Sequence, residues 1–486
     1  MKTDSMGREW QQRGARSPHP GPHGEGSTQP GGCEVRQVPA AKVPSPALAT
    51  QHLMNQVCSQ TNLERACQRV RANGGAPGID GMSVDALPAW LAANQGLLIE
   101  QLQQGTYQPT PVRGVRIPKP GGGSRQLGIP TVVDRLVQHA ILQVLEPWLD
   151  PTFSEFSYGF RPKRSAHQAL HQAARYVVEG YRMVVDLDLE QFFDRVNHDV
   201  LMARLARHVG DPRLLGLIRR FLQAGLFSQG VCIERDEGTP QGGPLSPLLA
   251  NLLLDDLDKE LEQRGHRFCR YADDCNIYVR TLVAGRRVKC SVTRFLERRL
   301  KLKVNEKKSA VAPVDERPFL GYRLREDGTL AVASHSLERV KEHIRQITRR
   351  TRGVSVERVI HDLNGRLPGW VRYFRYEKYG SVFRGLDQWI RRRLRCYVLK
   401  QKKRPYTVAR FLHTLGVPIE RAWSGACQCR RWWKASQHPA VKEGMNVAWF
   451  HAQGVVSLTQ QFESLQLLRK PPYTMSTYGG VGGRGT

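Results

Sequence analysis

The sequence predicts a mixed α/β body followed by a basic, largely helical module, and two observations carry this prediction. Strand-like and helix-like segments alternate up to about residue 325, which is typical of a mixed α/β fold. The composition then shifts, because residues 335–405 hold 20 Lys or Arg against 6 Asp or Glu. At 486 residues the chain is long enough for roughly two to four domains.

The individual elements follow from local patterns. Residues 63–90 predict a helix, a turn over the Gly- and Pro-rich "GGAPGIDG", and a second helix. Residues 107–130 predict two strands around a Gly-rich loop, and "TVVDRLVQHAILQVLEPWL" has apolar residues at helical spacing. "RMVVDLDLEQFF" (182–193) and "NIYV" are strand-like, whereas "RFLERRLKLKV" (294–304) predicts a helix.

The basic module contains a predicted helix at 386–398 with one mostly apolar face. Arg391, Arg392 and Arg395 lie off that face, and Arg393 lies closer to it. Aromatic residues interleave with the charges in "GWVRYFRYEKYGSVF" and "CRRWWK", which could supply base stacking beside phosphate contacts. For most of these aromatics we expect a place in the core, as for Trp370, Phe374 and Trp389.

The charge balance predicts a polyanionic partner. The net charge is +29 and the isoelectric point is near 10.1, so nucleic acid is favoured. A membrane surface is the rival, but no apolar run approaches the roughly 20 residues that span a bilayer. The first residues lack the pattern of a secretory signal, so we expect a bacterial cytoplasmic protein. Residues 1–48 and 471–486, rich in Gly, are expected to be disordered tails.

Acidic residues gather in two strand-like segments. Asp186 and Asp188 point to one face of an extended strand, and Asp194 follows them. "CRYADDCNIYV" places Asp273 and Asp274 side by side where a hairpin would turn. Neither stretch alone is diagnostic, since an Asp pair at a turn is common. Together they fit nucleotidyl transfer, which uses two divalent cations about 3.5–4 Å apart. Mg²⁺ prefers carboxylate and phosphate oxygens.

Seven ordered blocks resemble the motifs of a reverse transcriptase of the kind encoded by bacterial group II introns, the intron maturases. The resemblance covers about residues 60–420. The blocks are "RQLGIPTVVDRLVQHAIL", "FSYGFRPKRSAHQAL", "DLDLEQFFDRVNHDVL", "GTPQGGPLSPLLANLLLDDLD", "RYADD", "LKLKVNEKKS" and "FLGY". The module after residue 330 is similar to the thumb and maturase region in "LNGRLPGWVRYFRYEKYGSVFRGLDQWIRRRLR".

The resemblance implies an α/β (α+β) right-hand polymerase. It implies an N-terminal extension and fingers in 49–180 and a palm with an antiparallel sheet in 181–330. A helical thumb and maturase domain in 331–415 and a possible small DNA-binding region in 416–470 would follow.

The resemblance also implies the catalytic residues. Two Mg²⁺ ions would be held by Asp188 and Asp273, with Asp274 as a looser ligand and Asp186 as a neighbour. Lys308 would give a proton to the leaving pyrophosphate, with Lys307 as the close alternative. By itself, Lys308 is equally well explained as a cation at a helix end.

For the incoming dNTP, the resemblance implies that Lys119 and Arg125 grip the triphosphate. Phe193 would block a ribose 2′-hydroxyl, and Gln241 and Gly242 would contact sugar and base. Taken singly, Phe193 could be ordinary core, and the two basic residues could be solvated loop charges.

The resemblance further implies contacts to nucleic acid. Arg161 is expected to contact nucleotide or template, and Arg391, Arg392 and Arg395 are expected to contact intron RNA phosphates. A strand would hold the primer end through the residues of "FLGY": Phe319, Leu320, Gly321 and Tyr322.

The implied function is an RNA-directed DNA polymerase that binds its host group II intron RNA and promotes splicing and mobility. Its partners would be group II intron RNA, an RNA template with a DNA primer, target DNA and dNTPs. The ten cysteines are scattered, and Cys427 and Cys429 have no partner pair at zinc-finger spacing. This indicates free thiols. The resemblance then implies the branch that lacks the endonuclease domain, whose DNA target would be a nick, a replication fork or a single-stranded hairpin. Two alternatives remain: a splicing-only RNA-binding maturase, or a non-intron reverse transcriptase in defence or repair.

Overall fold

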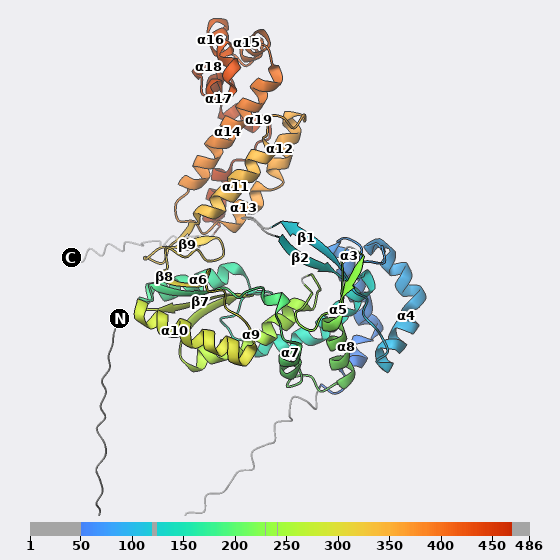
Figure 1. Ribbon diagram of the computed structural model, residues 1–486. Helices are drawn as coiled ribbons and strands as arrows, with labels where there is room; N and C mark the ends of the chain where they lie inside the picture. Colours follow the sequence, from blue (N-terminus) through green and yellow to red (C-terminus); the bar gives the residue numbers. More distant parts are fainter. Residues whose placement is uncertain (1–49, 119–123, 229, 241, 469–486) are drawn as a thin grey trace, which may run out of the picture. The chain divides into compact units, whose positions relative to one another are not determined.

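The computed structural model describes residues 50–118, 124–228, 230–240 and 242–468. Figure 1 shows a body of mixed helices and strands from α2 to β10, followed by helices from α11 to α20. This confirms the predicted mixed fold and the change to helices. No helix within the described ranges is long and apolar enough to cross a membrane. The expected tails, 1–48 and 471–486, lie outside the described residues.

The first elements form a helical cluster. Helix α5 contacts α2 and α3, and its apolar residues are buried over most of its length. Thr131 caps α5 by accepting a hydrogen bond from the backbone N of Asp134 (3.1 Å). The bounds are α2 (Leu53–Val57), α3 (Gln60–Asn73), α4 (Leu87–Gln104) and α5 (Val132–Leu149).

A first sheet follows from the predicted strand pair. Strands β1 (Val112–Pro118) and β2 (Ser124–Ile129) pair in antiparallel fashion, as expected for the two runs around the Gly-rich loop. Strand β1 also pairs in parallel with β4 (Leu226–Ser228), and β5 (Val231–Ile233) completes the order β2-β1-β4-β5. Helices α7 (His198–Leu205) and α8 (Pro212–Gln223) pack beside each other before β4.

The central sheet is antiparallel throughout and has the order β6-β7-β3-β8. Side chains alternate between its faces: Val185, Leu187 and Ile277 face one core with α9 and α10, whereas Val184 and Tyr278 join a second core with α6. In Figure 1, α6 lies on one side of this sheet and α9 and α10 on the other. The bounds are β3 (Met183–Leu187), β6 (Arg267–Tyr271), β7 (Asp274–Val279), β8 (Ala310–Pro313), α6 (Ala166–Val178), α9 (Ser246–Gln263) and α10 (Leu282–Phe295).

Two predicted elements have different bounds. The strand expected over 182–193 ends at Leu187, because Gln191 takes a left-handed φ of 50° and the short helix η3 (Phe192–Asp194) turns Phe192 into the core. The helix expected over 294–304 starts earlier, as α10, and its last turn η4 (Leu296–Leu300) ends at Lys301. Beyond that point burial alternates with period two, which is a strand pattern.

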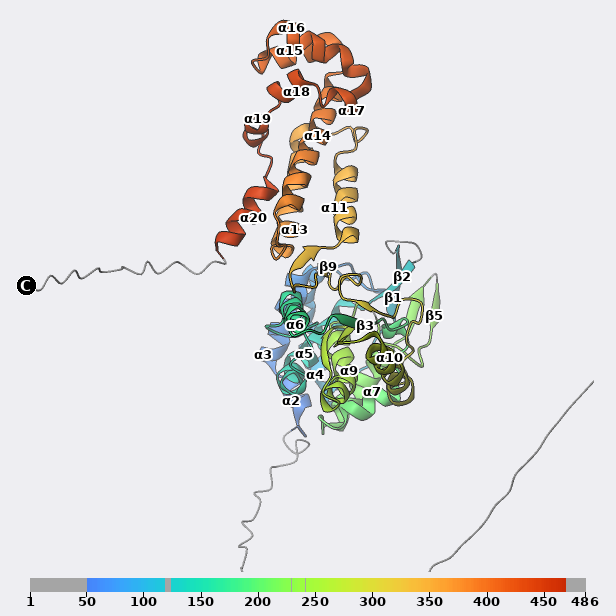
Figure 2. The same cartoon turned by 90° about the vertical axis from the view of Figure 1, so that its left-hand side faces the viewer.

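The remaining elements belong to the helical module. Strands β9 (Tyr322–Leu324) and β10 (Leu330–Val332) form a two-stranded sheet that leads into α11. Figure 2 shows the long helix α14 beside α11, with α20 returning along the same bundle. The helices are α11 (Ser334–Ile347), α12 (Val356–Asn364), α13 (Leu367–Tyr373), α14 (Ser381–Lys402), α15 (Pro405–Thr414), α16 (Ile419–Cys427), α17 (Trp432–Ala435), α18 (Pro439–Gly444), α19 (Val447–Ala452) and α20 (Leu458–Leu467).

Residues 416–468 share their core with the helices before them. Phe462 of α20 stacks on Phe383 of α14, with ring centroids 4.5 Å apart. The buried Asp387 of α14 accepts hydrogen bonds from the backbone N of Leu458 (2.9 Å) and of Thr459 (3.0 Å), and so satisfies the start of α20. This segment is therefore packed into the helical module rather than appended to it.

Candidate active site

The acidic face of the central sheet follows from strand alternation. In the β3–β7 ladder Val184 pairs with Tyr278, and Asp186 pairs with Asn276 two positions further along the same face. Asp188 directly follows β3 and comes level with Asp274, the first residue of β7. Three carboxylates from two segments thus gather on one face, where they line a pocket of about 380 Å³.

A tight turn between β6 and β7 carries Asp273. Tyr271 pairs with Asp274, so Ala272 and Asp273 form the turn, as the hairpin prediction required. Ala272 has a left-handed φ of 57°. A non-glycine residue in that region is strained, and it persists only where its surroundings hold it.

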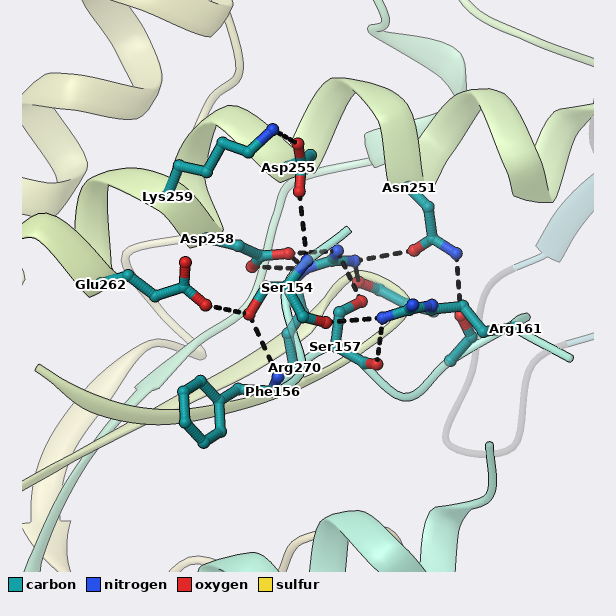
Figure 3. Close-up of polar contacts among 12 residues, drawn as sticks. Ser154, Phe156, Ser157, Arg161, Asn251, Asp255, Asp258, Lys259, Glu262 and Arg270 are labelled. Atoms are coloured by element: carbon teal, nitrogen blue, oxygen red, sulfur yellow. Dashed lines mark hydrogen bonds and ion pairs between the residues drawn. The ribbon is translucent and has the colours of Figure 1, made fainter. Parts of the chain in front are cut away.

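A buried arginine holds this turn in place (Figure 3). Arg270 is fully buried and forms an ion pair with Asp258, which is also fully buried. Its guanidinium donates to the carbonyl of Ala272 (2.9 Å), to Asn251 Oδ1 (2.9 Å) and to Ser157 Oγ (2.7 Å). All sides of a buried charge are thereby satisfied. The network fixes the residue that immediately precedes Asp273.

The segment around Gly159 packs against the same turn. A Cβ on Gly159 would lie 2.2 Å from the backbone N of Ala272, so only glycine fits. Arg161 was expected to contact nucleotide or template, but its side chain forms hydrogen bonds inside this segment. Its side chain is 4% exposed, and the guanidinium donates to Asp150 Oδ1 (2.6 Å) and to the carbonyl of Ser154 (2.5 Å). Arg161 therefore braces its own loop, and its contact with nucleotide or template stays a prediction.

The carboxylates of the acidic face are desolvated and repel one another. Desolvation in the pocket raises the pKa of Asp274 to about 6, and the charges of Asp273, Asp186 and Asp188 add to the shift. Burial also raises the pKa of Asp186, although an ion pair with Arg317 opposes the shift. Such mutual repulsion is what a bound divalent cation would relieve.

The segment after Leu302 supplies cations to this face. The ammonium of Lys308 lies 3.5 Å from Asp188 Oδ2, and Arg317 Nη2 lies 2.5 Å from Asp186 Oδ2. Lys307 lines the 380 Å³ pocket as well. Of the two lysines considered for proton donation, Lys308 is the one that forms an ion pair with a pocket carboxylate in the described part of the chain.

A second, larger pocket of about 1060 Å³ shares Asp188 and Lys308 with the first. Asp273 and Phe193 also line it, so the site lies between two pockets. Phe193 is half-buried and packs edge-on against the core residue Phe192. The basic residues that line the larger pocket are Arg116, Arg125, Arg235 and Lys308.

The loop before α9 is fastened to the segment that carries Phe193. The backbone N of Thr239 donates to the carbonyl of Phe193 (2.6 Å). Gly242 has a φ of 132°, and a Cβ there would lie 2.7 Å from the carbonyl oxygen of Gly128 in β2. Two predicted nucleotide contacts lie outside the described residues: Lys119 and Gln241.

Phe319, Leu320 and Gly321 form a turn and not the expected strand, which begins only at Tyr322 as β9. The backbone N of Phe319 donates to the carbonyl of Tyr322 (2.8 Å), and the reverse bond is 2.9 Å. Leu320 and Gly321 have φ values of 50° and 80°, since the chain must reverse before β9 pairs with β10. Phe319 and Leu320 nevertheless line the 380 Å³ pocket.

The arginines of α14 are largely engaged with neighbouring helices. Arg395 is buried and donates to the carbonyl of Met445 (2.9 Å), and Arg392 stacks over the ring of Trp433 at 3.8 Å. Arg393 donates to Thr348 Oγ1 (2.5 Å). The predicted outward position is therefore wrong for Arg395, because residues after 415 cover that side of the helix. Arg391 is half-buried.

The donor set suits Mg²⁺ even though no cage is preassembled. In the described part of the chain, no three His, Cys, Asp or Glu side chains converge closely enough to hold a metal ion by themselves. Mg²⁺ does not require this, because it keeps several waters and binds through one or two carboxylates plus substrate phosphates. Asp188, Asp273 and Asp274 supply hard oxygen donors at a site whose repulsion a cation would offset.

The two pockets are also lined by residues that were not predicted, among them Asn276 and three arginines. Asn276 lies two positions after Asp274, so strand alternation alone could have placed it on the acidic face. It is 3% exposed, and its Oδ1 has no hydrogen-bond partner among the described residues. The others are Arg116, Arg235 and Arg317, for which no periodic signal exists.

The sequence matches two family models. Residues 117–324 match the reverse transcriptase (RNA-dependent DNA polymerase) model, and residues 337–415 match the maturase-specific domain of group II introns. The first match contains β3, the β6–β7 hairpin and both pockets' acidic residues.

Several known proteins are similar to this chain. Protein YkfC of Escherichia coli (strain K12) is 34% identical over 320 residues, which is 57% of this chain and 84% of that protein. The group II intron-encoded protein LtrA of Lactococcus lactis subsp. cremoris is 38% identical over 206 residues, 42% of this chain and 34% of LtrA. A solved partial Cas6-RT-Cas1–Cas2 complex aligns with 51% of this chain and 43% of its own, at 27% identity and a TM-score of 0.34.

The chain belongs to the reverse transcriptase family of RNA-directed DNA polymerases, in the group that carries a group II intron maturase domain. It spans only about a third of the length of LtrA.

Proposed function

We propose that this chain is an RNA-directed DNA polymerase that extends a DNA primer on an RNA template and also binds group II intron RNA. One observation carries the proposal: Asp188 lines two adjoining pockets, one with Asp274 and the "FLGY" turn and the other with Asp273 and several basic residues. Residues 49–180 would serve as N-terminal extension and fingers, 181–330 as palm and 331–415 as thumb and maturase domain.

The chemistry is transfer of a nucleotide to a primer end. The 3′-oxygen attacks the α-phosphorus with a lone pair, and the bond to the bridging oxygen breaks with its electrons leaving on pyrophosphate. The 3′-hydroxyl proton passes to solvent, and Lys308 gives a proton to pyrophosphate. Two Mg²⁺ ions, when bound, activate the hydroxyl and neutralise the leaving group. Asp188, Asp273 and Asp274 would hold them.

The larger pocket is the proposed dNTP site. Arg116, Arg125 and Arg235 face the same space as Phe193, so a triphosphate and a sugar can be held at its two ends. Phe193 would exclude a ribose 2′-hydroxyl by its bulk. Replacement with Ala should therefore raise ribonucleotide incorporation relative to deoxynucleotide incorporation. An unchanged preference in the Phe193→Ala protein would remove this role.

The smaller pocket is the proposed site of the primer end. Phe319 and Leu320 line it from the turn, and Asp188 and Lys308 connect it to the dNTP site. A 3′-hydroxyl in the smaller pocket would then face the α-phosphorus of a nucleotide in the larger pocket across Asp188.

The intron-related role depends on the helical module and the charge of the chain. The maturase-specific match and the net charge of +29 favour binding of structured RNA, with splicing and mobility as the outcome. Of Arg391, Arg392 and Arg395, we assign Arg391 to an RNA phosphate.

Primer extension tests the polymerase proposal. The full chain is given a DNA primer on an RNA template with Mg²⁺ and dNTPs. Asp188→Asn and Asp273→Asn should each lower extension by about a thousandfold or more, since the charge at the reacting centre is lost. Asp199→Asn on α7, whose side chain is 78% exposed, is the matched control. Extension that survives both active-site changes would defeat the proposal.

A group II intron transcript tests the RNA-binding half in the same preparation. Faster intron excision with the protein, and binding that weakens steeply with salt, are the expected results. Polymerisation without any effect on the intron would instead favour a reverse transcriptase of defence or repair.

A further inference from the structure

Arg317 joins two parts of the active site that are far apart in sequence. Its Nε and Nη2 donate to Asp186 Oδ2 at 2.9 and 2.5 Å, and Nη2 also donates to the carbonyl of Lys308 (2.5 Å). Asp186 belongs to β3, and Lys308 to the segment between η4 and β8. A half-buried guanidinium with several donors in fixed geometry is suited to such a bridge.

The segment 305–309 wraps around the backbone of Asp188. The backbone N of Asn305 donates to the carbonyl of Asp188 (2.8 Å), and the backbone N of Asp188 donates to Ser309 Oγ (2.9 Å). Between these two attachments lies Lys308, whose ammonium reaches Asp188 Oδ2 at 3.5 Å. Arg317 is the contact that ties the Lys308 carbonyl itself to the sheet.

Asp186 is the anchor of this bridge and not a free carboxylate. Its pKa is raised first by burial, and Arg317 acts against that shift by hydrogen bond and charge. The pair lines the smaller pocket together with Asp188 and Lys308. The carboxylate of Asp186 is therefore paired with the guanidinium of Arg317. The carboxylates of Asp188, Asp273 and Asp274 stay available to bind cations.

We propose that Arg317 is a positioning residue for nucleotide transfer: anchored on Asp186, it fixes the backbone of Lys308 so that the ammonium stays beside Asp188. The effect of Arg317 on nucleotide transfer rests on the proposed function. Its effect on the backbone of residues 305–309, the structural half of the inference, does not. Arg317 acts through Lys308, so its value to the reaction depends on that lysine. A misplacement of about 1 Å is enough to lower a rate by about a hundredfold.

Hydrogen exchange tests the structural half without any activity. In Arg317→Gln, the backbone amides of 305–309 should exchange several-fold faster than in the unmodified protein, while α10 and β7 keep their rates. Arg323→Gln, which removes an exposed arginine on β9, is the matched control. Unchanged exchange at 305–309 would overturn the inference, because Asn305 and Ser309 alone would then suffice. Asp186→Asn, which frees Arg317 at its other end, should give a smaller increase and serves if Arg317→Gln does not fold.

A double-mutant cycle of kinetic measurements tests whether Arg317 affects nucleotide addition through Lys308. Arg317→Gln should lower kcat for single-nucleotide addition about ten- to hundredfold, with a smaller change in the KM for dNTP. Combined with Lys308→Met, it should cause little further loss, since the residue through which it acts is gone. An undiminished loss in the Lys308→Met background would show that Arg317 acts independently and would overturn the inference. If the unmodified chain adds no nucleotide at all, the proposed function fails while the exchange result still decides the inference.

Discussion

The acidic face of the central sheet and the basic helix α14 were predicted with the same kind of argument, yet the structure treats them differently. On the sheet, Asp186 and Asp188 lie on one face and Asp274 joins them across the ladder, as period-two alternation requires. On α14, Arg395 was placed outside by helical periodicity but lies buried against Met445. Alternation along a strand predicts which residues share a face, because a strand has only two faces. Helical periodicity predicts the faces of a helix in the same way, but the exposure of each face depends on which later segment packs against it.

The largest expected effect tests the support of the acidic face. Arg270→Gln should lower the free energy of unfolding by about 3–5 kcal/mol, because Asp258 would be left as a buried, unpaired charge. Primer extension should fall as the Ala272 turn loosens. Urea unfolding and extension assays measure the two effects.

The matched control for this prediction removes both charges. Arg270→Met with Asp258→Leu should recover much of the stability but not the extension activity, since the bond to the Ala272 carbonyl stays missing. Full activity in that double variant would mean that the turn needs no such support.

The second prediction separates two arginines of α14. Arg395→Ala should cost about 1–3 kcal/mol of unfolding free energy, because the buried carbonyl of Met445 loses its donor. Arg391→Ala should leave stability nearly unchanged but reduce the salt slope of RNA binding by about one. Thermal unfolding and RNA titrations at several salt concentrations check both. Equal stability losses would erase the distinction between the two positions.

The third prediction concerns the segment that covers α14. Asp387→Ala should lower the unfolding free energy by about 1–2 kcal/mol, since the start of α20 loses its acceptor. Hydrogen exchange should rise in α20 more than in α11. A uniform rise over both helices would show that the segment does not open separately.

Sequence patterns predicted those parts of the molecule that are fixed by local alternation. The β6–β7 turn, the pair β1–β2 and helix α5 were placed correctly. Contact with a distant segment was beyond the reach of these patterns. Arg395 was expected to point outward, but it is buried and donates to the carbonyl of Met445. Arg317 was overlooked because only the folded chain brings it to Asp186, 131 positions earlier.

The smallest expected effect concerns the free energy of unfolding that the protein loses by keeping Asp274 on the acidic face. Asp274 has a pKa of about 6 in the folded protein against an ordinary value near 3.8, so the folded state binds the proton more tightly. Its contribution to stability is therefore fully present below pH 4 and lost as the pH rises through 6. Asp274→Asn should stabilise the metal-free protein at pH 8 by about 1 kcal/mol, a value reduced for the exposure of this residue.

That gain should shrink as the pH falls through 6 and vanish near pH 4, as measured by urea unfolding in the presence of EDTA. The same substitution should lower primer extension when Mg²⁺ is supplied. A stabilisation that is independent of pH would mean that packing, and not charge, limits this position. Arg395→Ala should instead lose stability at every pH from 4 to 8, because the pKa of Arg395, about 10, lies above that range. The carboxylates of the acidic face would then lower the stability of the folded protein but serve its chemistry. The buried side of α14 would instead contribute stability and no chemistry.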